Sequence, residues 1–182
     1  MIITLTGKPC SGKSSVGRLF AKKYGFEFIS TGDMVREIAA KQGKTILELQ
    51  KDNGVFKIDH EVDSKTEHLG KTRINENIII DSRLAWHFIP KAFKVFIDVD
   101  WDIAGNRLFE AHREEEKVST PTQAKKLLKE RWFVENNRYE ELYSTSNLNL
   151  DNYDLVVSSD DKSEVEIVEI IHKEYLKFMR KA

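Results

Sequence analysis

The chain has 182 residues, and its 29 lysines and arginines are nearly balanced by 30 aspartates and glutamates, leaving a net charge of -1. This balance argues against a nucleic acid or an anionic membrane as a main partner. Cys10 is the single cysteine, which excludes an internal disulfide, and no apolar run approaches the ~20 residues of a membrane span. With no signal segment either, we expect a monomeric, cytoplasmic protein of one domain.

Five short runs rich in β-branched or aromatic residues are predicted as buried strands, at 2–6, 27–30, 77–81, 93–99 and 155–157. Longer helical patterns separate these runs. Such alternation predicts a parallel α/β sheet with right-handed crossovers, in which ligands bind at the carboxyl ends of the strands. The stretches 32–70 and 111–143 are long for plain crossovers, and we expect them to form helical excursions over that edge.

Three predicted helix starts carry a capping-box pattern, with a hydroxyl residue three positions before Glu or Gln: Thr45 with Glu48, Thr120 with Gln123, and Ser163 with Glu166. The last of these begins a C-terminal helix. Its spacing predicts one buried apolar face, formed by Val165, Val168, Ile171, Tyr175 and Phe178.

The first strand is followed by GKPCSGKS at positions 7–14, a full match to GxxxxGK[ST], and then by a helical pattern at 14–24. In this context, backbone N–H groups of the loop cradle the phosphates of a nucleotide. Lys13 is expected to reach the β- and γ-phosphates of ATP, and the Ser14 hydroxyl to bind Mg²⁺. Cys10 is interpreted as a small side chain tolerated in a tight loop, rather than as a redox sensor. The predicted ATP-binding residues here are Gly7, Lys8, Pro9, Cys10, Ser11, Gly12, Lys13, Ser14 and Ser15.

Such loops occur in nucleotide-hydrolysing switches and in kinases. The guanine-reading NKxD of GTPases is absent, and the DxxG at 102–105 falls inside a helical pattern. After the second strand, residues 30–36 read STGDMVR. Gly32 is predicted to allow a tight turn, Asp33 to open a helix, and Arg36 to grip a second phosphate in bidentate fashion.

At this point the sequence resembles the nucleoside monophosphate kinases, and among them most closely the short, archaeal type of cytidylate kinase. The resemblance runs in order through GKPCSGKSS, STGDMVREIA, IDHEVDSK, IIIDSRLAW, KERWFVENNRYEELY and YDLVVSS. It implies a P-loop NTPase three-layer fold with a five-stranded parallel sheet, as a single kinase domain over 1–182. It also implies a helical insertion that binds the monophosphate, at about 32–70, and a lid at about 111–143.

The resemblance further implies roles for individual residues. Asp81 matches an acidic position near the metal's water shell, and Arg83 matches an arginine at the monophosphate. Arg107 matches a lid or adenine-contacting arginine. The monophosphate-binding segment corresponds to Ser30, Gly32, Asp33 and Arg36.

Two departures from related kinases bear on the acceptor base. Adenylate kinases tend to have a glycine and a proline around the arginine matched by Arg83, where this chain has Ser82 and Leu84. Bacterial cytidylate kinases place a base-reading aspartate at the position of Leu84, so the base contact must come from elsewhere. Asp59 and Asp63, four residues apart on one predicted helical face, are the candidates, because a carboxylate can accept from the amino group of cytosine.

Arginines in the second long stretch complete the predicted site. Arg131 and Arg138 are seven residues apart, about 10.5 Å along one helical face, which suits two cations along the line of phosphoryl transfer. Arg113 is placed at the start of a mobile segment, 114–120, on the ATP side. Lys13, Arg83, Arg131 and Arg138 are the predicted catalytic residues.

The predicted reaction is transfer of the γ-phosphate of ATP, with Mg²⁺, to CMP or dCMP. Two alternatives remain open: a kinase for another small acceptor such as UMP or AMP, and a regulatory ATPase. The five histidines show no metal-ligand spacing with cysteine and are interpreted as surface or packing residues.

Overall fold

The computed structural model describes residues 1–43, 54–112 and 118–181, with the side chains of all of these except 54–59. Its centre is a five-stranded sheet in the order β2-β3-β1-β4-β5, with every neighbouring pair parallel. All five predicted strands are present, with ends shifted by at most one residue: β1 Ile2–Gly7, β2 Glu27–Ser30, β3 Ile78–Asp81, β4 Phe93–Asp98 and β5 Leu155–Ser158.

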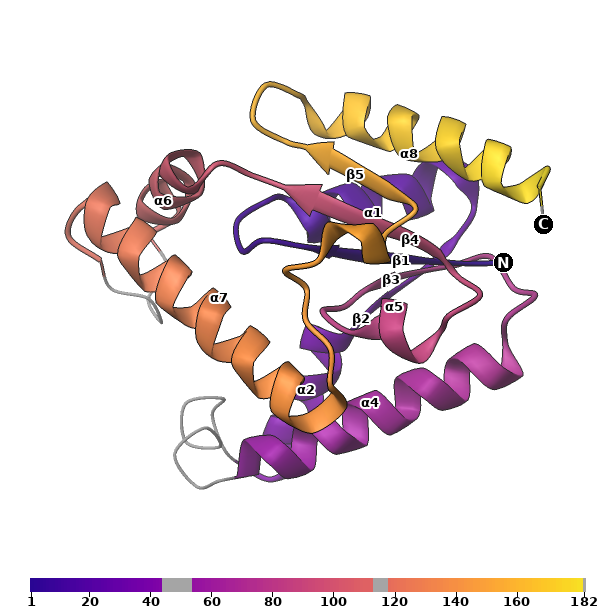
Figure 1. The fold of residues 1–182 in the computed structure, drawn as a ribbon, viewed down its shortest axis with the longest axis horizontal. Coiled ribbons are helices and arrows are strands. Elements are labelled where there is room, and N and C mark those ends of the chain that lie inside the picture. The colour runs from indigo at the N-terminus through magenta and orange to yellow at the C-terminus, as the bar shows by residue number, and fades with distance from the viewer. Residues whose placement is uncertain (44–53, 113–117, 182) are drawn as a thin grey trace.

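Helices cover both faces of this sheet, as the three-layer prediction requires (Figure 1). Because side chains alternate along a strand, Ile3 and Leu5 pack with helices α1 (Lys13–Tyr24) and α8 (Glu164–Met179) on one face. On the other face, Ile2 and Ile80 pack with α5 (Ala85–Phe88) and with the C-terminal part of α4 (Gly54–Thr72). The three consecutive isoleucines of β3 therefore pack against the helices on both faces of the sheet, as expected of a central parallel strand.

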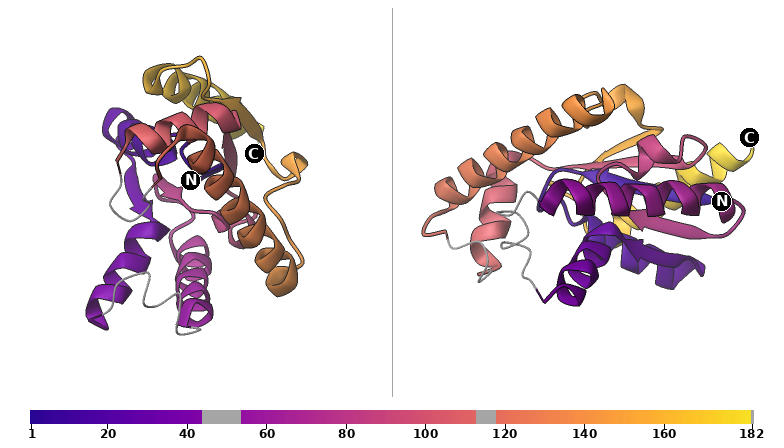
Figure 2. Two further views of the ribbon diagram at one scale, coloured as in Figure 1. Left: turned by 90° about the vertical axis from the view of Figure 1, so that its left-hand side faces the viewer. Right: turned by 90° about the horizontal axis from the view of Figure 1, so that it is seen from below.

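Two helical excursions leave the sheet at the carboxyl ends of strands, as predicted. Helix α2 (Thr31–Lys41) and then α4 lie between β2 and β3, while α6 (Trp101–Glu110) and α7 (Pro121–Tyr143) lie between β4 and β5. A short 3₁₀ turn, η1 (Leu150–Asn152), leads from α7 into β5. The two views in Figure 2 show α2 with α4, and α6 with α7, as two separate helical projections. Their assignment as monophosphate-binding insertion and lid stays a prediction.

The helix starts agree in part with the capping predictions. Ser163 and Glu166 form the complete capping box of α8. The Thr120 hydroxyl accepts from the N–H of Gln123 at 3.2 Å, but the Gln123 side chain accepts from the N–H of Ser119 rather than from that of Thr120. The third predicted pair, at 45 and 48, lies outside the described residues.

The buried face of α8 differs from the prediction at one position. Val165 is 54% exposed, whereas Ile167 is buried with Val168, Ile171 and Tyr175. At 100° per residue, Ile167 lies closer to the centre of that stripe than Val165 does.

Among the described residues, no helix is both long enough and apolar enough to cross a bilayer.

Candidate active site

The GxxxxGK[ST] loop joins β1 to α1, as its motif predicts. Gly7 passes so close to β4 that a Cβ atom there would lie 2.2 Å from the carbonyl oxygen of Ile97, so only glycine fits. Gly12 adopts a left-handed conformation with φ of 84° immediately before α1. The resulting loop lines a cavity of about 240 Å³ with the seven residues Pro9 to Ser15.

Asp81 lies beside the first turn of α1, because β3 and β1 are neighbours in the sheet and Leu5 pairs with Asp81 in the register. The Ser14 hydroxyl donates to Oδ2 of Asp81, and the Nζ of Lys13 lies 3.8 Å from Oδ1 of the same carboxylate. The structure thus brings together the three side chains predicted to serve the donor phosphates and the metal.

Arg83 and Arg131 line the same cavity as the loop, although they come from the segment after β3 and from α7. Between them lies Glu135, whose side chain is 13% exposed. Its Oε1 accepts from the Nε of Arg131 at 3.1 Å and also pairs with the guanidinium of Arg83. Burial alone would lower the pKa of Arg83, but Glu135 and the Tyr139 hydroxyl raise it, so this guanidinium stays charged.

Glu135 and Tyr139 are site residues that the sequence reasoning missed. Both fall inside KERWFVENNRYEELY, a stretch whose two arginines are the residues predicted to act. The four-residue spacing from Arg131 to Glu135 is a helical ion-pair signal that was available. Among the described residues, three cations (Lys13, Arg83 and Arg131) face two carboxylates (Asp81 and Glu135), which leaves one positive charge for an anionic ligand.

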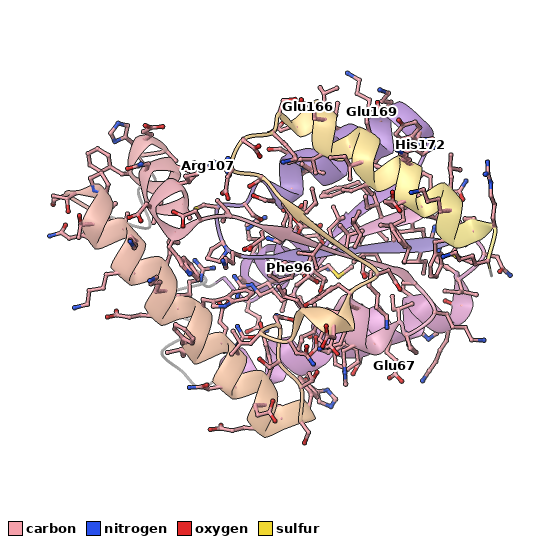
Figure 3. The ribbon with its side chains drawn as sticks, turned by 45° about the horizontal axis from the view of Figure 1, so that its top comes forward. Glu67, Phe96, Arg107, Glu166, Glu169 and His172 are labelled. Atoms are coloured by element: carbon pink, nitrogen blue, oxygen red, sulfur yellow. The ribbon has the colours of Figure 1, made fainter. Side chains whose placement is uncertain are left out.

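Two further residues of the predicted ATP site hold the loop from outside. The Nζ of Lys8 pairs with Asp98 at 2.7 Å and donates to the carbonyl oxygen of Val99 at 3.1 Å, so its side chain is directed to the end of β4 and does not line the cavity. Arg107 of α6 donates to the carbonyl oxygens of Cys10 at 3.2 Å and of Ser159 at 2.7 Å. Figure 3 shows Arg107 between α6 and the segment that joins β5 to α8.

The STGDMVR segment begins α2, and two details of its prediction are wrong. The helix begins at Thr31, so Gly32 lies inside the first turn and makes no tight turn before it, and Asp33 does not open the helix. The N-cap is Ser30, whose hydroxyl accepts from the N–H of Asp33 at 3.2 Å. Ser30 can act as the cap because it lies just before the helix, where its hydroxyl accepts from the N–H of the third helical residue.

Arg36 projects from the first turns of α2, as predicted, but it pairs there with Asp33. Arg18 of α1 also approaches Asp33, at 3.1 Å. The Arg36 guanidinium holds the pKa of the Asp33 carboxyl below its usual range. Neither Arg36 nor Asp33 is among the described residues that line the loop cavity.

The remaining predicted residues lie along α4 and α7. Oδ2 of Asp63 accepts from the Tyr143 hydroxyl at 2.5 Å. Arg138 lies next to Tyr139, with its guanidinium carbon 5.6 Å from the ring centroid, and it is not part of the loop cavity that Arg131 lines. Arg113 and the side chain of Asp59 lie outside what the structure describes.

The loop fits a phosphate chain and a hard divalent cation. The Ser11 hydroxyl is buried in the cavity wall and has no hydrogen-bond partner among the described residues, as expected where a ligand supplies one. The described residues contain no group of three or more His, Cys, Asp or Glu able to cage a metal. One hydroxyl beside one carboxylate suits Mg²⁺, which keeps several waters and binds substrate phosphates.

The sheet order, the GxxxxGK[ST] loop and the cationic cavity define an α/β phosphotransferase with the P-loop kinase fold. The chain belongs to the cytidylate kinase-like family, whose model matches residues 2–161. It is accordingly a phosphotransferase of the nucleoside monophosphate kinase type.

Two relatives named cytidylate kinase agree with this assignment. The chain is 33% identical to the cytidylate kinase of Archaeoglobus fulgidus, over 95% of this chain and 93% of that protein. It is 32% identical to the cytidylate kinase of Sulfurisphaera tokodaii, over 98% and 97%. It is also 35% identical to an S-adenosylmethionine-dependent nucleotide dehydratase of Lacinutrix mariniflava, but it spans only 36% of that protein's length.

Solved structures share the fold. The shikimate kinase of Bacteroides thetaiotaomicron superposes with a TM-score of 0.67 at 18% identity, over 99% of this chain and 98% of that one. An uncharacterized protein of Eubacterium ventriosum superposes with a TM-score of 0.71 at 16% identity, over 95% and 96%.

Proposed function

We propose that the protein transfers the γ-phosphoryl group of ATP to CMP or dCMP, giving CDP or dCDP and ADP. The observation that carries this proposal is the shared cavity: Lys13 and Ser14 of the loop, and Arg83 and Arg131 from two other segments, line the same space. Such a cavity can hold two anionic groups end to end. Family membership and the relatives named cytidylate kinase support the choice of acceptor.

On the donor side, N–H groups of the loop and of the first turn of α1 bind the phosphates of ATP. Lys13 neutralises charge on the β- and γ-phosphates. Mg²⁺ would be held by the Ser14 hydroxyl, with Asp81 beside it, and supplies neutralisation of charge on the transferring group. The hydrogen bond from Ser14 to Asp81 supports this proposal, because it holds the hydroxyl and the carboxylate side by side.

On the acceptor side, Arg36 and Arg83 bind the monophosphate, and Arg131 stabilises the charge that spreads over the equatorial oxygens during transfer. An oxygen of the monophosphate attacks the γ-phosphorus, and the bond from that phosphorus to the β–γ bridging oxygen breaks, which releases ADP. No side-chain base is needed, because phosphoryl transfer depends on positioning and charge stabilisation. Helices α6 and α7, with Arg107, Arg113, Arg131 and Arg138, would close over the nucleotides and exclude water.

A panel of acceptors tests the proposal. In a coupled assay with ATP and Mg²⁺, CMP and dCMP should give the highest kcat/KM among CMP, dCMP, UMP, AMP and GMP. A higher value with AMP than with CMP would overturn the acceptor assignment. Slow ATP hydrolysis that no monophosphate accelerates would instead favour a regulatory ATPase. We do not propose dehydratase activity, because the chain spans so little of that relative.

A further inference from the structure

Tyr143 is the last residue of α7, and its hydroxyl reaches the helix of the other projection. It donates to Oδ2 of Asp63 on α4 at 2.5 Å. The Tyr143 side chain therefore reaches from the C-terminal end of α7 to α4, two segments that overlap in the view of Figure 1. The helix that carries Arg131 is thereby connected to the helix that carries the candidate base-reading carboxylate.

The Tyr143 ring is held in place by α5. The ring of Phe88 meets it edge-on with 5.2 Å between centroids, and the ring of His87 lies at 6.1 Å. Helix α5 begins two residues after Arg83, so Arg83 and the rings that pack on Tyr143 belong to one short segment. These two ring contacts restrict the position of the Tyr143 ring and therefore of its hydroxyl.

The orientation of α4 brings Asp63 to this donor. Asp63 and Gly70 are seven residues apart and so lie on one face of the helix. A Cβ atom at Gly70 would lie 2.7 Å from the side chain of Ile89, which shows how closely this face of α4 approaches the segment that follows α5. Asp63 is half-buried on this face, whereas His60, Ser64 and His68 lie on the exposed one.

The distance along α7 between Glu135 and Tyr143 is comparable to the length of a nucleoside monophosphate. Glu135, which pairs with Arg83, and Tyr143, which donates to Asp63, are eight residues apart, or about 12 Å of helix. A nucleoside monophosphate extends over a comparable length from its phosphate to the far edge of its base. A phosphate at Arg83 would place that edge near Asp63.

We propose that Tyr143 is a specificity-determining positioning residue, which orients the Asp63 carboxylate so that its other oxygen accepts from the exocyclic amino group of cytosine. The inference rests on the proposed function and deepens it. A charged carboxylate only accepts hydrogen bonds, and uracil presents a carbonyl oxygen where cytosine presents an amino group. An Asp63 fixed by Tyr143 therefore attracts CMP and repels UMP.

The test compares CMP and UMP as acceptors for the wild type and for Tyr143→Phe, which keeps the ring packing and removes the hydroxyl. We expect KM for CMP to rise about tenfold while kcat changes by less than about twofold, the loss expected for one hydrogen bond to a charged group. KM for UMP should stay nearly constant, so the ratio of kcat/KM for CMP to that for UMP falls about tenfold.

Tyr24→Phe is the matched control, because the Tyr24 hydroxyl donates to Glu169 at 3.1 Å on the far, exposed α1–α8 surface. It should leave both kinetic constants unchanged. A second variant, Asp63→Asn, should lower the CMP-to-UMP ratio further, and adding Tyr143→Phe to it should then change the ratio by less than about twofold, because the tyrosine acts through the carboxylate.

Two results would overturn the assignment while leaving the proposed function standing. One is a CMP-to-UMP ratio in Tyr143→Phe that stays within about twofold of the wild type. The other is an equal rise in KM for both acceptors with a lowered Tm, which would show that Tyr143 only supports packing. A wild-type enzyme that prefers a purine acceptor would overturn both the assignment and the proposed function.

Discussion

Glu135 follows Arg131 by one turn of α7 and accepts a hydrogen bond from its Nε at 3.1 Å, while the same carboxylate pairs with Arg83. A single acidic side chain thus sets the positions of two arginines that come from separate parts of the chain. Without it, the two guanidinium groups would repel each other inside one cavity. Glu135 is therefore expected to act on catalysis through the arginines, as a positioning residue.

Replacing Glu135 by glutamine should lower both KM and kcat, for different reasons. The cavity becomes more positive, so KM for the monophosphate falls by about threefold, while the two arginines lose their common partner and kcat falls about tenfold. Steady-state kinetics with saturating ATP measures both constants. Glu130→Gln, at an exposed position on the same helix, is the control and should match the wild type. An unchanged kcat in Glu135→Gln would contradict the positioning role.

Arg36 and Arg131 should affect different kinetic constants. Arg36 belongs to α2, away from the loop cavity, and is proposed to bind the acceptor in both ground and transition states. Arg36→Ala should therefore raise KM for the monophosphate by about tenfold at nearly constant kcat. Arg131 lines the loop cavity, and Arg131→Ala should mainly lower kcat, by about 10³-fold. If neither variant alters the kinetics, the assignment of the site is wrong.

Asn136 should be a strong determinant of stability. Its side chain is 1% exposed, its Oδ1 accepts from the N–H of Asn147 at 2.7 Å, and its Nδ2 donates to the carbonyl oxygen of Trp132 at 2.7 Å. Asn136→Ala leaves the buried N–H of Asn147 without this partner and should lower the free energy of unfolding by about 2–3 kcal/mol.

Urea unfolding at 25 °C measures this loss. Asn137→Ala offers a matched control on the same helix, because Asn137 is exposed, and its effect should stay within about 0.5 kcal/mol. Equal effects of the two substitutions would show that the hydrogen bonds of Asn136 contribute little to the free energy of unfolding.

His87 should make the protein less stable in mild acid. Burial, and to a smaller extent Lys94, lower the pKa of this imidazole below its ordinary value of 6.5. The folded state therefore binds the proton less readily than the unfolded chain does. This contribution to stability is fully present above pH 6.5 and is lost as the pH falls through the lower pKa of the folded state.

Urea unfolding between pH 7.5 and pH 5 checks the assignment. His87→Gln should show a shallower decline of the unfolding free energy in this range than the wild type does. If the two profiles run parallel, the titration of His87 does not contribute.

The parts of the molecule that could be predicted are those with local signals. The apolar run at Ile78 to Ile80 indicates a buried strand by itself, and the spacing of Gly7, Gly12 and Lys13 indicates the phosphate loop. Because parallel strands end at one edge, the meeting of Asp81 with Ser14 was also within reach of sequence reasoning.

The parts that were missed depend on how distant segments pack. Glu135 meets Arg83 across more than 50 residues, and Tyr143 meets Asp63 across 80, so their roles follow from the docking of α7 against α5 and α4. The prediction at the start of α2 is wrong for a separate, local reason: Ser30 and not Asp33 is the N-cap, so Gly32 lies inside the helix. No periodicity in the sequence reports these contacts.

The proposed donor-side and acceptor-side residues lie on different parts of the fold, and this separation has a consequence for how such an enzyme can change during evolution. The proposed donor-side groups Lys13, Ser14 and Asp81 lie where β1 and β3 end, next to the buried sheet, whereas Arg36, Asp63 and Tyr143 lie on projecting helices. Substitutions on those helices can alter acceptor preference while the core keeps its packing. A lineage could therefore exchange one acceptor for another in small steps, each of which retains a folded, ATP-binding protein.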